Sequence, residues 1–172
     1  MKLYKLFIVF WAVFIVTKAI GQNTNSKIKN GKKKEYLSRP LVTHIYTADP
    51  AAHVFKNRIY IYPSHDTATG VAKDVEASHY DMMDYHVLSM DSVGGNIIDH
   101  GVALSVENIA WAKKQLWAPD AVYINNQYYF YFPAKNKQNI FQIGVATSSK
   151  PEGPFVAEQQ PIKGSYSIDP CL

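Results

Sequence analysis

The chain has 172 residues, a formal net charge of +4 and one cysteine, Cys171. Eight of the 18 basic residues but only one of the 14 acidic residues lie in residues 1–36, so the remainder carries a net charge of −3. The body of the chain is therefore mildly acidic, which argues against nucleic acid as a partner. A single cysteine cannot form an internal disulfide, so an apolar core must hold the fold.

The first 21 residues have the pattern of a secretory signal peptide. Lys2 and Lys5 precede an unbroken apolar run over residues 6–16, and small residues follow as far as Gly21. This run is shorter than the ~20 residues that a membrane-spanning helix needs. We expect cleavage near Gly21 and an exported protein, periplasmic or extracellular, with no stable membrane insertion. Residues 22–40 then form a basic linker.

From residue 41 onward, short runs of β-branched and aromatic residues alternate with turn residues, and this pattern predicts an all-β chain. The segments Lys56-Asn57-Arg58 and Asn125-Asn126-Gln127 each separate two such runs and predict two hairpins. The expected strands cover residues 51–55, 59–62, 85–90, 97–104, 121–124, 128–132 and 141–147, with a further strand near Phe155.

The two predicted hairpins repeat each other at one fixed offset. Ala51 matches Ala121, Val54 matches Ile124, Tyr60 matches Phe130 and Pro63 matches Pro133. Each unit holds roughly four strands, which is the size of one blade of a β-propeller. The repeat therefore predicts a propeller built of such blades.

An aspartate and a proline lie together at the expected start of the innermost strand of each unit, as Asp49-Pro50, Pro119-Asp120 and Asp169-Pro170. One such pair would be read as an ordinary turn. Three pairs at corresponding places indicate a function, because the inner strands of a propeller converge on a central cavity. Carboxyl groups that face each other there suit acid/base cleavage of a glycosidic bond.

Five segments stand out along the chain: Thr47-Ala48-Asp49-Pro50, Tyr62-Pro63-Ser64-His65-Asp66, Leu116-Trp117-Ala118-Pro119-Asp120, Pro151-Glu152-Gly153-Pro154-Phe155 and Ser167-Ile168-Asp169-Pro170. Taken together and in this order, they resemble glycoside hydrolase family 43. The resemblance runs from about Pro40 to the last residue. It implies a five-bladed propeller, of which residues 41–172 supply roughly the first two blades and the start of the third. It also implies an inverting glycosidase acting on xylose- or arabinose-containing plant polysaccharides, as a β-xylosidase, α-L-arabinofuranosidase or arabinanase.

The resemblance assigns roles to individual residues. Asp49 matches the general base, and Asp169 matches the residue that raises the pKa of the general acid and orients it. Trp117 is either a wall against a pentose ring or buried core, and Asp120 either binds a sugar hydroxyl or opens a strand. His65 and Asp66 match an element that contacts the sugar or braces a loop.

The general acid and a metal site are not expected among these residues. The family's general acid is a Glu that follows Asp169, so the chain as given is expected to be an inactive N-terminal part. Asp84 and His86 share one face of a strand and are interpreted as solvated surface residues, so no metal ligand is predicted. The resemblance allows a central divalent metal in the complete fold, built partly from a later His.

Two other functions fit the sequence. One is a propeller that binds oligo- or polysaccharide without cleaving it. The other is a secreted β-rich adhesion or scaffold module, in which the aromatic residues are only core and the Asp-Pro pairs only turns.

Overall fold

The computed structural model describes residues 39–67, 70, 72–73, 77 and 79–172, and residues 39–172 form one compact unit. The predicted signal peptide and most of the predicted linker lie outside the described residues. Within the part that is described, no helix has the length and apolar character needed to cross a membrane.

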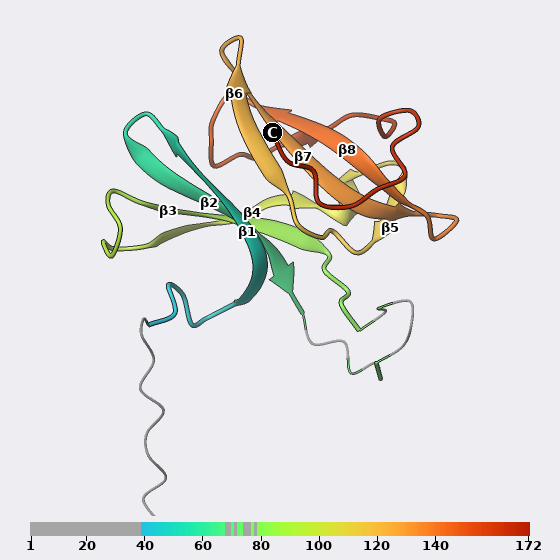
Figure 1. The fold of residues 1–172 in the computed structure, drawn as a ribbon, viewed down its shortest axis with the longest axis horizontal. Coiled ribbons are helices and arrows are strands. Elements are labelled where there is room, and N and C mark those ends of the chain that lie inside the picture. The colour runs from blue at the N-terminus through green and yellow to red at the C-terminus, as the bar shows by residue number, and fades with distance from the viewer. Residues whose placement is uncertain (1–38, 68–69, 71, 74–76, 78) are drawn as a thin grey trace, which may run out of the picture. The chain divides into compact units, whose positions relative to one another are not determined.

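The first sheet contains four antiparallel strands in the order β1-β2-β3-β4 (Figure 1). They are β1 (Tyr46–Phe55), β2 (Arg58–Asp66), β3 (Asp84–Met90) and β4 (Ile98–Ser105). All four were expected from the sequence and are confirmed, although β1 and β2 are several residues longer than predicted. Sequential order along a sheet is the arrangement of a propeller blade.

The second sheet repeats this order with β6 (Asp120–Ile124), β7 (Gln127–Asn136), β8 (Phe141–Ser148) and β9 (Val156–Ala157). Two short elements precede it, the 3₁₀ helix η1 (Val106–Asn108) and the strand β5 (Ala112–Lys114), which pairs with the far end of β7. The sequence did not predict η1 and β5, because three residues are too few to show a period.

The two hairpins close in the same way, which confirms the internal repeat. Their closing pairs are Phe55 with Arg58 and Ile124 with Gln127, so each loop has two residues and not the three that were predicted. Lys56 and Asn57 have φ of 50° and 61°, and Asn125 and Asn126 have φ of 51° and 59°. Two successive residues with positive φ match the right-handed twist of the flanking strands.

An aromatic core joins the two sheets. Tyr62 and Tyr85 of the first sheet meet Phe130 of the second, with ring centroids 5.8 Å and 5.0 Å away, and all three side chains are fully buried. Hydrogen bonds also cross between the sheets, from Tyr62 Oη to the Pro151 carbonyl at 2.8 Å and from the Phe155 N–H to the Ala103 carbonyl at 2.8 Å. Burying each ring contributes about 2 kcal/mol to the free energy of folding, so this aromatic layer holds the two sheets together.

The three Asp-Pro pairs do not all open a strand, although the sequence had led us to expect it. Asp49 lies inside β1 and not at its start, at a bulge where the pairing register shifts between Ala48 and Ala51. Asp120 does open its strand, as expected. Asp169 belongs to no strand in the described part of the chain, but the segment that follows it reaches β6, because the Leu172 N–H donates to Asp120 Oδ2 at 2.8 Å.

Candidate active site

A cavity of about 350 Å³ opens where β1 and β2 meet the segments that lead into β3 and β6. Its lining includes two carboxylates, two aromatic rings and a thioether, from Asp49, Asp66, Tyr80, Trp117 and Met82. A concave site with mainly apolar walls and a few convergent polar groups is typical of a small-molecule pocket. Its size suits one or two sugar rings.

Asp49 reaches this cavity because of the bulge in β1. Its backbone has φ of 46°, in the left-handed region that few residues other than glycine occupy, although aspartate tolerates it better than most. A bulge redirects a side chain away from the regular alternation of a strand, and bulges are frequent beside active sites. The exposed Asp49 carboxylate is thus presented to the cavity and to solvent, as a group that activates water requires.

Asp66 reaches the same cavity from the end of β2, and His65 does not. Adjacent residues of a strand point to opposite faces, so only one of the two can contribute to the cavity wall. The structure places Asp66 on the lining. The His65 ring turns to β3, with Nδ1 2.6 Å from Asp84 Oδ1.

The segment before β3 forms one wall of the cavity and is tied to the segment before β6. The Leu116 N–H donates to the Met82 carbonyl at 2.8 Å, and the Gln115 side-chain amide donates to the Ala77 carbonyl at 2.7 Å. Trp117 Nε1 donates to the Tyr80 carbonyl at 3.1 Å. These bonds join two stretches that are more than thirty positions apart and hold the two cavity rings in place.

Trp117 lines the cavity and is only partly buried, so it is not a residue of the closed core. Its ring lines the cavity, and it also packs against Phe141, with centroids 4.5 Å apart. The Tyr80 ring stands edge-on to it at 6.5 Å and 85°. An indole held from behind can offer its remaining face to the apolar face of a sugar.

Tyr85 supports this wall from inside the core. Its hydroxyl donates to the Trp117 carbonyl at 2.6 Å, and the side chain is fully buried. Burial raises the pKa of the Tyr85 hydroxyl well above its usual range. The hydroxyl therefore stays protonated and remains a donor to this carbonyl.

Asp120 is engaged in the fold and is not part of the cavity lining. It is 6% exposed, and Oδ1 accepts from the Ala121 N–H at 2.8 Å and lies 2.6 Å from Nε2 of His53 on β1. The Leu172 N–H donates a hydrogen bond to Asp120 Oδ2. Sequence reasoning missed His53, because its partner lies 67 positions away in the second sheet and no local pattern marks it.

Asp169 lies on an exposed segment near Asp120. Its φ of 55° resembles that of Asp49, and each of the two aspartates is followed by a proline. The recurring backbone conformation supports the match between these two positions that the sequence suggested.

A histidine–aspartate cluster lies on the face of the first sheet that carries His65, Asp84 and His86. The ligand atoms of these three side chains all lie within 4.8 Å of one another. His86 Nδ1 is 2.9 Å from an oxygen of Asp99, which also contacts His44 Nε2 at 2.6 Å. The interpretation of Asp84 and His86 as solvated surface residues is therefore wrong, because both are partly buried in a hydrogen-bond network.

Asp99 is the acceptor at the centre of this network. Burial by itself would raise the pKa of the Asp99 carboxyl, but hydrogen bonds from His44, the Gly101 N–H and His86 outweigh it and lower this pKa to about 2. The carboxylate is therefore ionised at neutral pH.

The residues around Asp49 do not provide a metal site of their own. The only group of three metal-ligating side chains in the described part of the chain is the histidine–aspartate cluster, and it is not on the cavity lining. Asp49 and Asp66 alone do not make a donor set for a central divalent ion. None of the described glutamates, Glu107, Glu152 and Glu158, lines the cavity either.

Comparisons with known proteins agree with this geometry. The family model described as glycosyl hydrolases family 43 matches residues 37–172. "Xylosidase/arabinosidase 43A" of Humicola insolens is 58% identical over 135 residues, covering 77% of this chain and 41% of the relative. "Xylosidase/arabinosidase" of Bacteroides ovatus is 56% identical over 135 residues, covering 78% of this chain and 42% of the relative.

A solved structure is similar over the same region. It is CoXyl43, a β-xylosidase/α-arabinofuranosidase from a compost microbial metagenome in complex with xylotriose, with a TM-score of 0.75 and 61% identity over 77% of this chain and 40% of that one. The chain thus spans about 40% of the length of the relatives that it matches. Its two sheets are blades of the five-bladed propeller of these enzymes. The chain belongs to glycosyl hydrolases family 43.

Proposed function

We propose that the protein containing this chain is an exported glycosidase that removes xylose or arabinose units from plant polysaccharides or their oligosaccharides. The observation that carries the proposal is the position of Asp49, which a bulge presents to a cavity walled by Trp117 and Tyr80. The high identity to xylosidase/arabinosidases supports the choice of pentosides as substrates.

In this proposal Asp49 is the general base of an inverting reaction. It accepts a proton from a water molecule that attacks the anomeric carbon, while a carboxylic acid on the other side of the sugar protonates the leaving oxygen. Inverting enzymes keep these two carboxyl groups ~6.5–9.5 Å apart to leave room for the water. The exposed Asp49 carboxylate on the cavity lining supports its role as the base in this arrangement.

The acid must come from outside the residues described here. Glu152 lies in the turn before β9, Glu107 lies in η1 and Glu158 follows β9, and none of the three lines the cavity with Asp49. We therefore expect residues 1–172 alone to bind sugar weakly and to turn over no substrate.

Export is proposed from the leader. Two lysines precede an apolar run of eleven residues, which is the pattern of a cleaved leader. Mass spectrometry of the protein secreted from its native leader should find a mature chain that starts near Gln22. A retained leader would contradict export by cleavage.

Replacing Asp49 by Asn in the full-length protein tests the catalytic assignment. Loss of a general base should lower kcat on aryl β-xylosides and aryl α-arabinofuranosides by about 10²–10⁴-fold with little change in KM. Asp91→Asn is a matched control, because this side chain is 84% exposed on a hairpin far along the sheet. Proton NMR of the first sugar released should show the inverted anomer.

The outcomes separate the proposal from its competitors. Wild-type turnover by a folded Asp49→Asn variant would remove Asp49 from the mechanism. A wild-type protein that binds xylo-oligosaccharides but never cleaves them would instead be a carbohydrate-binding propeller. A protein that does neither would be an adhesion or scaffold module.

A further inference from the structure

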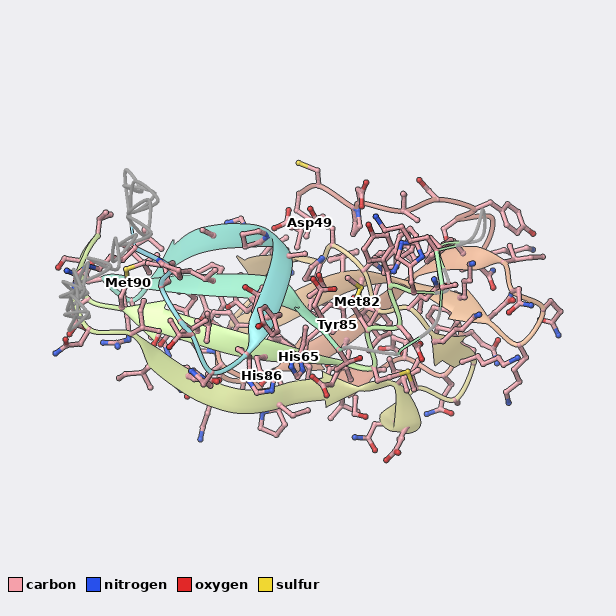
Figure 2. The ribbon with its side chains drawn as sticks, turned by 90° about the horizontal axis from the view of Figure 1, so that it is seen from below. Asp49, His65, Met82, Tyr85, His86 and Met90 are labelled. Carbon is pink, nitrogen blue, oxygen red and sulfur yellow. The ribbon has the colours of Figure 1, made fainter. Side chains whose placement is uncertain are left out.

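The histidine–aspartate cluster of His65, Asp84 and His86 lies outside the candidate active site. Figure 2 shows the His65 and His86 side chains next to each other and away from Asp49, and their ring centroids are 4.8 Å apart. Ser64 on β2 pairs with Tyr85 on β3 in an antiparallel register, so His65 and Asp84 lie opposite each other one step further along. His86 follows Asp84 by two residues and therefore points to the same face. The pairing of β2 with β3 thus brings three side chains that can bind a metal ion close together.

The distances in this cluster are close to those between neighbouring ligand atoms of one metal ion. Bonds of about 2.0–2.2 Å from one ion to tetrahedral nitrogen and oxygen ligands place neighbouring ligand atoms about 3.4 Å apart. Here His65 Nδ1 lies 2.6 Å and His86 Nε2 lies 3.9 Å from the same oxygen, Oδ1 of Asp84. One separation is shorter and the other longer than this value, and all three ligand atoms lie within 4.8 Å of one another. An ion between them would replace the hydrogen bond between His65 and Asp84 and would require the side chains to rotate.

A second carboxylate, that of Asp99, orients His86 as a metal ligand. Both oxygens of Asp99 lie within reach of His86 Nδ1, at 2.9 Å and 3.1 Å. The Gly101 N–H donates to Asp99 Oδ1 at 2.8 Å and holds that carboxylate in place. A histidine that donates its Nδ1 proton to a carboxylate leaves Nε2 unprotonated and directed at its other neighbour, as in carboxylate–histidine–metal arrangements.

We propose that His65, Asp84 and His86 form a binding site for a first-row divalent transition-metal ion, with Zn²⁺ as the representative ion and Asp99 as the residue that orients His86. Two imidazoles and one carboxylate suit zinc and similar ions, whereas Ca²⁺ and Mg²⁺ prefer all-oxygen shells. The three side chains are 13–23% exposed, so an ion can reach them and water can complete the shell.

The bound ion would link β2 to β3 close to the candidate active site. Asp66, which lines the cavity, follows His65, and Met82, which also lines it, lies two residues before Asp84. Ion binding therefore stabilises the end of β2, which carries Asp66, and the start of β3, which follows Met82 by two residues. It contributes no group to the proposed reaction and is independent of the proposed function.

The test is Zn²⁺ binding by the tag-free full-length protein after dialysis against a chelator. Titration in competition with a chromophoric chelator should show one ion bound per chain and lost in His65→Ala and His86→Ala. Asp99→Asn should keep the stoichiometry but weaken affinity by about 10–100-fold. His100→Ala is the matched control, because this histidine lies on the same sheet but bonds to Ser89, and it should bind zinc as the wild type does.

Two readouts do not depend on the variants folding. Anomalous diffraction at the zinc edge should place a peak between His65 and His86 in the wild-type protein, and Co²⁺ should give the intense visible bands of a tetrahedral site. A peak elsewhere, no binding, or unchanged binding in a folded His86→Ala variant would overturn the proposal. Binding of Ca²⁺ at this site in preference to Zn²⁺ would overturn it as well.

Discussion

His53 on β1 and Asp120 on β6 connect the two blades through their inner strands, with His53 Nε2 2.6 Å from Asp120 Oδ1. The carboxylate is nearly buried, and the same oxygen accepts the Ala121 N–H. A buried carboxylate must have its hydrogen bonds satisfied, so the fold depends on this contact between residues 67 positions apart.

Replacing His53 by Ala should destabilise the full-length protein by about 1–3 kcal/mol, because a partner of a buried carboxylate is lost. Urea unfolding followed by fluorescence measures the change. Val54→Ala is the control, since the adjacent side chain is 68% exposed and its loss should cost little. Equal midpoints for the two variants would show that the contact adds nothing.

Replacing Gly144 by Ala should overpack the core of the second blade. A Cβ on Gly144 would lie 2.6 Å from Trp111 Cζ2 and still closer to the Phe132 ring. Overpacking of this kind costs about 1–3 kcal/mol and lowers the melting temperature. Adding Phe132→Leu should recover part of the loss, and strictly additive effects of the two changes would argue against a steric cause.

Replacing Trp117 by Ala should raise KM for aryl xylosides by roughly tenfold, equivalent to losing about 1.4 kcal/mol of binding. The ring lines the cavity, and its Nε1–H also holds the Tyr80 carbonyl. Trp117→Phe keeps an aromatic face and should lose less. Unchanged KM together with a lower melting temperature would assign Trp117 to the core alone.

Replacing Asp169 by Asn tests its proposed effect on the general acid. A nearby negative charge raises the pKa of a carboxylic acid, so removing it should lower the pKa of that acid. The alkaline limb of the kcat/KM profile should then move to lower pH, while the acid limb, set by the base, stays in place. An alkaline limb that does not move would contradict this role.

Much of the fold was predictable from the sequence. The aromatic run over residues 128–132 and the turn residues at Lys56-Asn57 and Asn125-Asn126 are local signals, and the structure confirms the strands that they predicted. The short elements β5 and η1 were not predicted, because three residues are too few to show a period.

The candidate site was less predictable. The sequence singled out Asp49, which does line the cavity, but it was expected at the start of its strand and lies inside β1, because a bulge shows only in the pairing with β2. His65 and Asp66 were treated as one element, yet they point to opposite faces, one to Asp84 and the other to the cavity. His53 was missed because its partner lies in the next blade.

The amino-acid sequence by itself determined the all-β class, the repeated hairpins and the aspartates worth testing, because side-chain alternation, turn chemistry and short motifs are properties of neighbouring residues. Only the tertiary structure decided which of these groups meet. The pairing of β2 with β3 brought His65 to Asp84 and His86, and the packing of two blades brought His53 to Asp120. Register and packing between distant strands depend on the whole assembled core, so no local pattern could specify them.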